Sequence, residues 1–125
     1  MKKLNWLVVI SLLLLVTTAV ACQQTEVRPA PIHEVRVAIA ESYPPQVMVY
    51  IQGGLSDGCT KFHELKTERS GNTVNIAVTT RRPKNAMCTQ VYGYFEQNVN
   101  LGSDFVSGKT YTIKVNDKTT SFVME

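Results

Sequence analysis

This chain has few histidines, and its other potential catalytic residues do not form any recognised catalytic motif. There are only two histidines in 125 residues. No stretch has the spacing of a serine-hydrolase nucleophile, a zinc-peptidase helix, a phosphate-binding glycine loop or an acidic calcium loop. Each of these chemistries needs its residues at a fixed spacing. The sequence therefore predicts a protein that is not an enzyme, with no cofactor and no bound metal ion.

Long hydrophobic runs are also lacking, except at the amino terminus. Two lysines precede an almost unbroken apolar run from Leu4 to Val16, and small residues follow as far as Ala21. This order of charged, apolar and small residues is typical of a cleaved secretory signal. The apolar run is also too short for a membrane-spanning helix. We predict a signal peptide over residues 1–21 and an exported protein. The alternative is that the segment is retained as an anchor helix.

The remaining chain has little excess charge of either sign. Loss of Lys2 and Lys3 with the signal leaves 11 of the 13 basic residues against 10 acidic ones. A near-neutral chain has no bulk electrostatic attraction for polyanions, so we expect no nucleic-acid partner.

Cys22 stands directly after the predicted signal. The stretch Ala19-Val20-Ala21-Cys22 resembles the bacterial lipobox, although Ala19 occupies a position where Leu is usual. The resemblance implies that the Cys22 thiol is lipidated, which predicts a cell-envelope protein anchored in a membrane and facing the periplasm or the cell exterior. Cleavage by an ordinary signal peptidase, which accepts the same small residues, stays open.

The other two cysteines, Cys59 and Cys88, lie 29 positions apart. If lipid takes Cys22, these two pair without leaving a free thiol, and an exported protein meets the oxidising conditions that favour a disulfide. A zinc site with His63 and perhaps His33, and a thiol nucleophile, are the alternatives. Neither has its usual local spacing, so we predict a Cys59–Cys88 disulfide.

Residues 22–33 are polar and contain Pro29 and Pro31, which predicts a stiff tether between the lipid and a domain over residues 34–125. In that domain apolar and polar residues alternate, as in half-buried strands. Strands are predicted at residues 34–39, 46–52, 73–80, 87–99, 110–115 and 119–125, whereas residues 59–69 fit a strand or a short helix. "GGLSDG" reads as a turn, and Asn116-Asp117 suits a tight hairpin turn.

These elements predict an all-β fold. About seven short strands with one apolar face each are best buried in a two-layer antiparallel β-sandwich. The closing residues 107–125 resemble the last hairpin of immunoglobulin-like domains in bacterial surface proteins, where a Tyr such as Tyr111 opens an alternating strand. The inter-sheet Trp of that family, and its Cys two residues after the Tyr, are missing here. More broadly, residues 34–125 resemble small bacterial exported domains of uncharacterised role. This resemblance implies a fold and a cellular location but no activity.

A rigid sandwich presents its loops for binding, so we predict an extracytoplasmic binding module with an envelope protein as its partner. The loops expected to make contacts hold Tyr43, Pro44, Pro45, Asp57, Arg81, Arg82 and Lys84. The alternative is a small protease inhibitor that acts through the end loops, although the Asn-Pro-Thr-Thr-Gly-Tyr loop of such inhibitors is absent. A purely structural envelope component is a third possibility.

Overall fold

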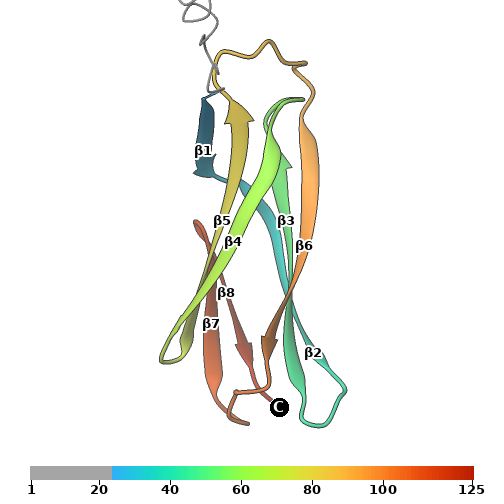
Figure 1. Cartoon of the computed structure of the whole chain (residues 1–125). Coiled ribbons are helices and arrows are strands. Elements are labelled where there is room, and N and C mark those ends of the chain that lie inside the picture. The colour runs from blue at the N-terminus through green and yellow to red at the C-terminus, as the bar shows by residue number, and fades with distance from the viewer. Residues whose placement is uncertain (1–23) are drawn as a thin grey trace, which may run out of the picture.

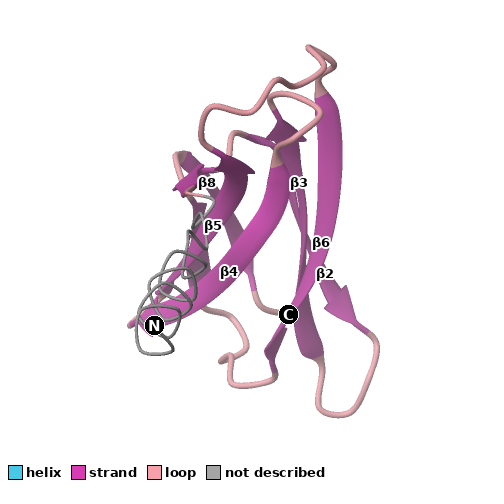
Figure 2. Cartoon of the chain, turned by 45° about the horizontal axis from the view of Figure 1, so that its top comes forward, coloured by secondary structure: helices cyan, strands magenta, loops and turns pink. Residues whose placement is uncertain are grey.

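The computed structural model describes residues 24–125, which form two β-sheets packed against each other (Figure 1). The predicted signal peptide at residues 1–21 and the predicted lipidation site at Cys22 lie outside the described residues. Over residues 24–125 there is no helix long and apolar enough to cross a membrane. All the regular elements of this part of the chain are strands (Figure 2).

Eight strands make up the two sheets. They are β1 (Thr25–Pro29), β2 (Ile32–Ala40), β3 (Gln46–Leu55), β4 (Lys61–Ser70), β5 (Thr73–Pro83), β6 (Gly93–Gly102), β7 (Thr110–Val115) and β8 (Lys118–Val123). In the five-stranded sheet β5 pairs with β4 on one side, whereas β1 and β7 share its other side and β8 follows β7. The three-stranded sheet has the order β2-β3-β6. The predicted two-layer β-sandwich is therefore confirmed.

The core lies between the sheets and is built from alternate residues of the central strands. Val49 and Ile51 of β3 face Val78 of β5 and Ile113 of β7, and all four side chains are fully buried. Because side chains alternate across a strand, the period-two pattern in the sequence was sufficient to identify these inward positions.

One pair of strands departs from the antiparallel arrangement that we predicted. β5 and β7 run parallel, with Thr73 opposite Thr112 and Ile76 opposite Val115. β7 then turns into β8 at Asn116, whose φ of 51° is the left-handed conformation expected of a tight hairpin turn.

Several boundaries differ from the prediction, and one undecided segment is now assigned. Residues 25–33 were assigned to the tether, but β1 and the start of β2 are strands of the sandwich. Gly53 and Gly54 were read as a turn but lie inside β3, because the turn begins only after Leu55. The predicted strand over residues 87–99 begins at Gly93, and the chain before it is a loop. The undecided segment at residues 59–69 is strand β4.

Candidate functional site

The residues predicted to make contacts lie at two opposite ends of the sandwich (Figure 1). Tyr43, Pro44 and Pro45 form the β2–β3 loop, where the Tyr43 side chain is fully exposed. Asp57 in the β3–β4 loop belongs to the other end, together with the end of β5 and the β5–β6 loop, which contribute Arg81, Arg82 and Lys84. No single site therefore uses all the predicted residues.

A disulfide joins the two loops of the second end, which we call the disulfide end. Cys59 and Cys88 are bonded, with their Cα atoms 5.5 Å apart, so the predicted pairing is confirmed. Beside it, the Gly58 N–H donates to the Thr89 carbonyl at 2.8 Å. The β3–β4 and β5–β6 loops thus form one tied unit.

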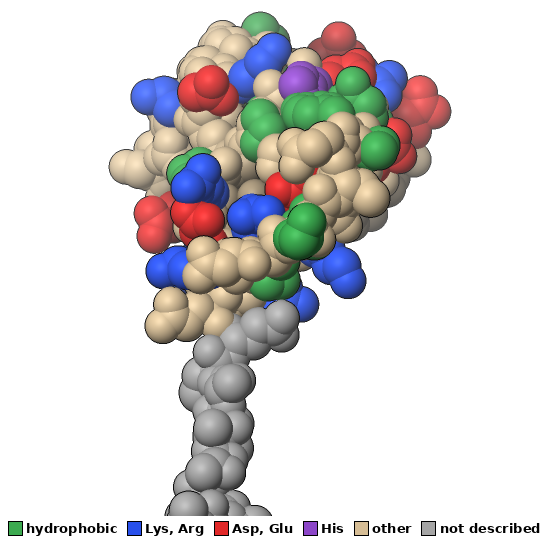
Figure 3. All heavy atoms as spheres, turned by 90° about the horizontal axis from the view of Figure 1, so that it is seen from above, with side chains coloured by type: hydrophobic (Ala, Val, Ile, Leu, Met, Phe, Trp, Pro, Cys, Tyr) green, Lys and Arg blue, Asp and Glu red, His purple; other side chains and the backbone are tan. Residues whose placement is uncertain are grey.

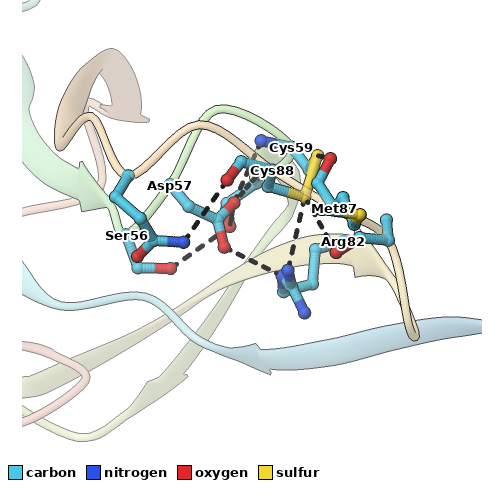
Figure 4. Close-up of a disulfide and its surroundings, with 9 residues drawn as sticks. Ser56, Asp57, Cys59, Arg82, Met87 and Cys88 are labelled. Atoms are coloured by element: carbon cyan, nitrogen blue, oxygen red, sulfur yellow. Dashed lines mark hydrogen bonds and ion pairs between the residues drawn. A yellow bond between two sulfur atoms is a disulfide. The ribbon is translucent and has the colours of Figure 1, made fainter.

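Asp57 stabilises the turn that carries Cys59 (Figure 4). Its Oδ1 accepts hydrogen bonds from the Cys59 N–H at 3.0 Å, the Thr60 N–H at 2.9 Å and the Thr60 hydroxyl at 2.8 Å. The Thr60 hydroxyl, the Cys59 N–H and the Arg82 guanidinium lower the pKa of the Asp57 carboxyl below its usual 3.8, against the opposing effect of partial burial. The carboxylate is thereby held in its charged form.

Arg82 provides the opposite charge to Asp57. Its Nε lies 3.1 Å from Asp57 Oδ2, but off the direction of the N–H bond, so the contact is an ion pair without a hydrogen bond. One terminal nitrogen of Arg82 donates to Cys88 Sγ at 3.4 Å. Asp57 and Arg82, both among the predicted contact residues, bind each other in the structure, and Arg82 also contacts the disulfide.

Asp57 also belongs to the one group in the described chain with metal-like spacing. Its carboxylate and the sulfurs of Cys59 and Cys88 lie within 4.8 Å of one another. Because the two sulfurs are bonded to each other, they offer no thiolate to a metal ion. The cluster is a structural one.

Beside the disulfide end, the outer face of the three-stranded sheet carries an aromatic cluster of His33, Tyr92 and Tyr94. The ring centroids are 5.4–5.8 Å apart and the rings meet edge to face. A hydrogen bond of 2.5 Å joins His33 Nε2 to the Tyr92 hydroxyl. The Tyr92 and Tyr94 side chains remain 45% and 60% exposed, so the cluster offers ring surface to a partner. Seen from above, one histidine and several hydrophobic-class side chains lie side by side on the surface (Figure 3).

Gly54 creates the space in which this cluster packs. A Cβ atom at this position would overlap the Tyr92 hydroxyl and lie 2.8 Å from His33 Nε2. The neighbouring Gly53 has the same role on the inner face, where a Cβ atom would overlap the Phe95 ring. The two glycines therefore admit one aromatic ring on each side of β3.

Further along the same face, Tyr50 is held between charged neighbours. Its hydroxyl donates to Glu96 Oε1 at 2.7 Å, and the Arg36 guanidinium lies 4.4 Å from the ring centroid. The hydrogen bond to Glu96, together with partial burial and the carboxylate charge, raises the pKa of Tyr50 above its usual 10.0, and Arg36 opposes this. Beyond them, Asn100 donates to Gln46 at 2.7 Å. This part of the face is already internally paired.

Sequence reasoning missed the aromatic cluster, since none of its three residues was among the predicted contact residues. A signal was nevertheless present, because Tyr92 and Tyr94 share a parity opposite to that of Phe95, which is buried. Nothing in the sequence around His33 indicated that its side chain would join the aromatic cluster. A break in the β2–β3 register between Ile32 and Glu34 leaves His33 without a paired residue on β3.

The fold and the paired loops define a small disulfide-stabilised β-sandwich domain. A comparison with protein families places residues 49–124 in the ORF11 beta-sandwich domain family, and the chain belongs to that family. Cys59, Cys88, Tyr92 and Tyr94 all fall within the matched residues, whereas His33 precedes them.

Three proteins of Herpetosiphon aurantiacus are similar to this chain. The "Uncharacterized 10.2 kDa protein in HgiCIIM 5'region" is 49% identical over 86 residues, which cover 69% of this chain and 90% of that protein. The corresponding proteins in the HgiBIM and HgiEIM 5'regions are each 54% identical over 76 residues, covering 61% of this chain and 92% of each relative. No solved structure matches the chain.

Proposed function

We propose that this protein is an extracytoplasmic binding module without catalytic activity, anchored to an envelope membrane through lipid on Cys22. The observation that carries the proposal is the exposed aromatic cluster of His33, Tyr92 and Tyr94 on the face of a sheet. Its partner is an envelope protein that covers these rings.

Two properties make the cluster suitable for binding. Tyrosine rings provide a large contact area with little conformational entropy to lose, and they are frequent among the residues that dominate interface energies. Here the rings also support one another, since His33 bonds to Tyr92 and both pack on Tyr94. A preorganised surface loses less entropy on binding than a mobile one.

The chemistry of the remaining polar groups supports binding over catalysis. Asp57 and Arg82 neutralise each other, and His33 Nε2 is bonded to a phenol rather than to a nucleophile. The Cys59–Cys88 disulfide supports the exported location, because such bonds persist in oxidising compartments.

The experiment is capture of partners from a detergent-solubilised envelope fraction on the immobilised mature protein. Tyr92→Ala combined with Tyr94→Ala should abolish the capture of a specific protein. Tyr43→Ala, which removes an even more exposed tyrosine at the opposite end, should leave that capture unchanged. Equal capture by both variants would exclude the cluster as the binding surface.

A protease inhibitor is the second candidate. It is favoured by Met87, which is fully exposed in the loop next to Cys88, as an apolar side chain on a disulfide-held inhibitory loop would be. A panel of proteases incubated with the protein tests this candidate. Inhibition that is lost in Met87→Asp would support it, and no inhibition of any protease would reject it.

A further inference from the structure

The described chain begins at the disulfide end. The Lys84 N–H of the β5–β6 loop donates to the Gln24 carbonyl at 2.8 Å, and Thr25 pairs with Pro83 in the sheet. Figure 1 shows β1 starting beside that loop, far from the β2–β3 loop. The chain therefore enters the sandwich beside the β5–β6 loop, one of the two loops that the disulfide joins.

A lipid on Cys22 would hold this end close to a membrane. Only Gln23 and Gln24 separate Cys22 from Thr25. Since an extended chain advances at most about 3.6 Å per residue, the Cα atoms of Cys22 and Thr25 are at most about 11 Å apart. A tether this short cannot let the β2–β3 loop reach the same bilayer as its anchor while the disulfide end stays in solution.

The disulfide end has apolar side chains that no other part of the described chain covers. Met87 is 101% exposed and Val91 is 67% exposed, both in the β5–β6 loop. Val27 of β1, opposite Arg81 in the sheet register, is 49% exposed. Exposed apolar side chains close to a lipid anchor are suited to insert at the boundary between the headgroups and the acyl chains of the membrane.

The same end carries cations that have no carboxylate partner among residues 24–125. Lys61, Arg81 and Lys84 are exposed and form no ion pair in this range. Lys61 and Arg81 face each other across β4 and β5, so their side chains lie on one face. Figure 3 shows Lys and Arg side chains around the start of the described chain, with hydrophobic side chains between them.

Carboxylates near these cations are already neutralised. Asp57 pairs with Arg82, and Glu26 pairs with Arg28. The opposite end is mixed in sign, because it exposes Glu41 and Asp104 as well as Lys109. The opposite end also exposes apolar side chains, Tyr43 and Val106, but there the cation Lys109, unpaired within the described residues, is offset by the carboxylate of Glu41, which is likewise unpaired there. Anionic phospholipids therefore attract the disulfide end more strongly than the opposite end.

We propose that the β5–β6 loop, with Met87 and Val91 at its apolar centre and Lys61, Arg81 and Lys84 around it, rests on the phospholipid surface of the membrane that holds Cys22. The inference depends on the proposed anchoring. The disulfide end of the sandwich then faces the membrane, and the aromatic cluster, on the side of the sandwich, lies near the lipid headgroups. A partner bound there is held at the membrane surface.

A single tryptophan tests this contact. The only Trp of the chain, Trp6, lies in the predicted signal peptide, so one introduced Trp is the sole reporter in the mature protein. The full chain, processed in cells and purified from membranes, is reconstituted in vesicles of phosphatidylcholine and phosphatidylglycerol. Met87→Trp should emit at shorter wavelength and be quenched several-fold more by brominated lipid than Tyr43→Trp at the opposite end. Equal quenching of the two reporters would overturn the inference.

Three further measurements make the result unambiguous. Val91→Trp repeats the test at a second loop position. Arg81→Gln with Lys84→Gln should reduce the quenching of Met87→Trp on anionic vesicles, whereas Lys109→Gln should not; no difference would refute the electrostatic part. Flotation of the wild-type protein with the vesicles reports on the anchor itself. A protein that fails to float contradicts the proposed anchoring, whereas one that floats with an unshielded residue 87 contradicts only the docked orientation.

Discussion

Asn116 and Val78 hydrogen-bond each other in both directions, although 38 positions separate them in the sequence. The Val78 N–H donates to Asn116 Oδ1 at 2.9 Å, and Asn116 Nδ2 donates to the Val78 carbonyl at 2.9 Å. The same Nδ2 donates to the Ala30 carbonyl at 2.7 Å. The side-chain amide thus takes the place of a peptide group beside β5, at the point where β7 has ended its pairing with Ile76 and β1 has not yet begun at Thr79.

We predict that Asn116→Asp lowers the free energy of unfolding by on the order of 2 kcal/mol, because both donated hydrogen bonds are lost and a carboxylate faces two carbonyl oxygens. Asn116→Gly keeps the left-handed φ but removes all three bonds, so it should be similarly destabilised. Denaturant unfolding measures both variants. Asp117→Asn is the matched control, and an equal loss in that variant would assign the effect to the turn alone.

The disulfide is expected to make a large contribution to stability. Replacing both Cys59 and Cys88 by Ser opens a loop of 29 positions, which should cost roughly 3–4 kcal/mol in the chain-entropy picture. Thermal unfolding of the variant, compared with the oxidised wild type, measures this. A change in melting temperature within experimental error would mean that the other contacts, the Asp57–Arg82 ion pair and the Gly58–Thr89 hydrogen bond, hold this end together.

Asp57 should make stability depend on pH in the acid range. Its pKa is lower in the folded protein than the usual 3.8, so its contribution is present above pH 3.8 and is lost as the pH falls through the lowered pKa. Asp57→Asn removes this contribution, and its melting temperature should approach that of the wild type as the pH falls from about 5 to about 2. Asp104→Asn, which removes an exposed carboxylate at the other end, is the control. A constant difference between wild type and Asp57→Asn at all pH values would contradict the prediction.

The two glycines of β3 should respond differently to alanine. Gly53→Ala forces Phe95 out of its place in the core, and overpacking of this kind typically costs about 1–3 kcal/mol. Gly54→Ala meets only the far ends of the Tyr92 and His33 side chains, which are exposed and free to move into solvent. We therefore expect a smaller loss of stability, together with altered NMR signals of the His33 and Tyr92 rings. Unchanged ring signals in Gly54→Ala would show that the cluster does not depend on this glycine.

Much of the fold was predictable because it depends on local alternation. Val47, Val49 and Ile51 alternate with polar or half-buried neighbours, and all three are fully buried in β3. The alternation of apolar and polar residues failed to predict a strand whose residues do not differ in polarity. Residues 25–29 read as a polar tether, yet β1 is a strand because its backbone pairs with β5, and that pairing is invisible in side-chain polarity.

The contact residues were harder to predict than the strands. Asp57 and Arg82 are both charged and lie at the same end of the sandwich, Asp57 in the β3–β4 loop and Arg82 at the end of β5, so each was a reasonable ligand contact by itself. Their pairing depends on the β3–β4 loop meeting the end of β5, which happens only after the sheets assemble. His33 and Tyr92, 59 positions apart, likewise meet only through the order β2-β3-β6 and the missing side chain at Gly54.

The sequence by itself determined that this chain forms a two-layer β-sandwich, because alternation selects the buried face. It also predicted that Cys59 and Cys88 pair, because they are the two cysteines that remain when Cys22 is set aside as the predicted lipidation site. Only the tertiary structure decided which polar residues neutralise each other and which rings remain exposed. These outcomes depend on distances between residues far apart in the chain, and such distances are set by the packing of the sheets and by the order of their strands.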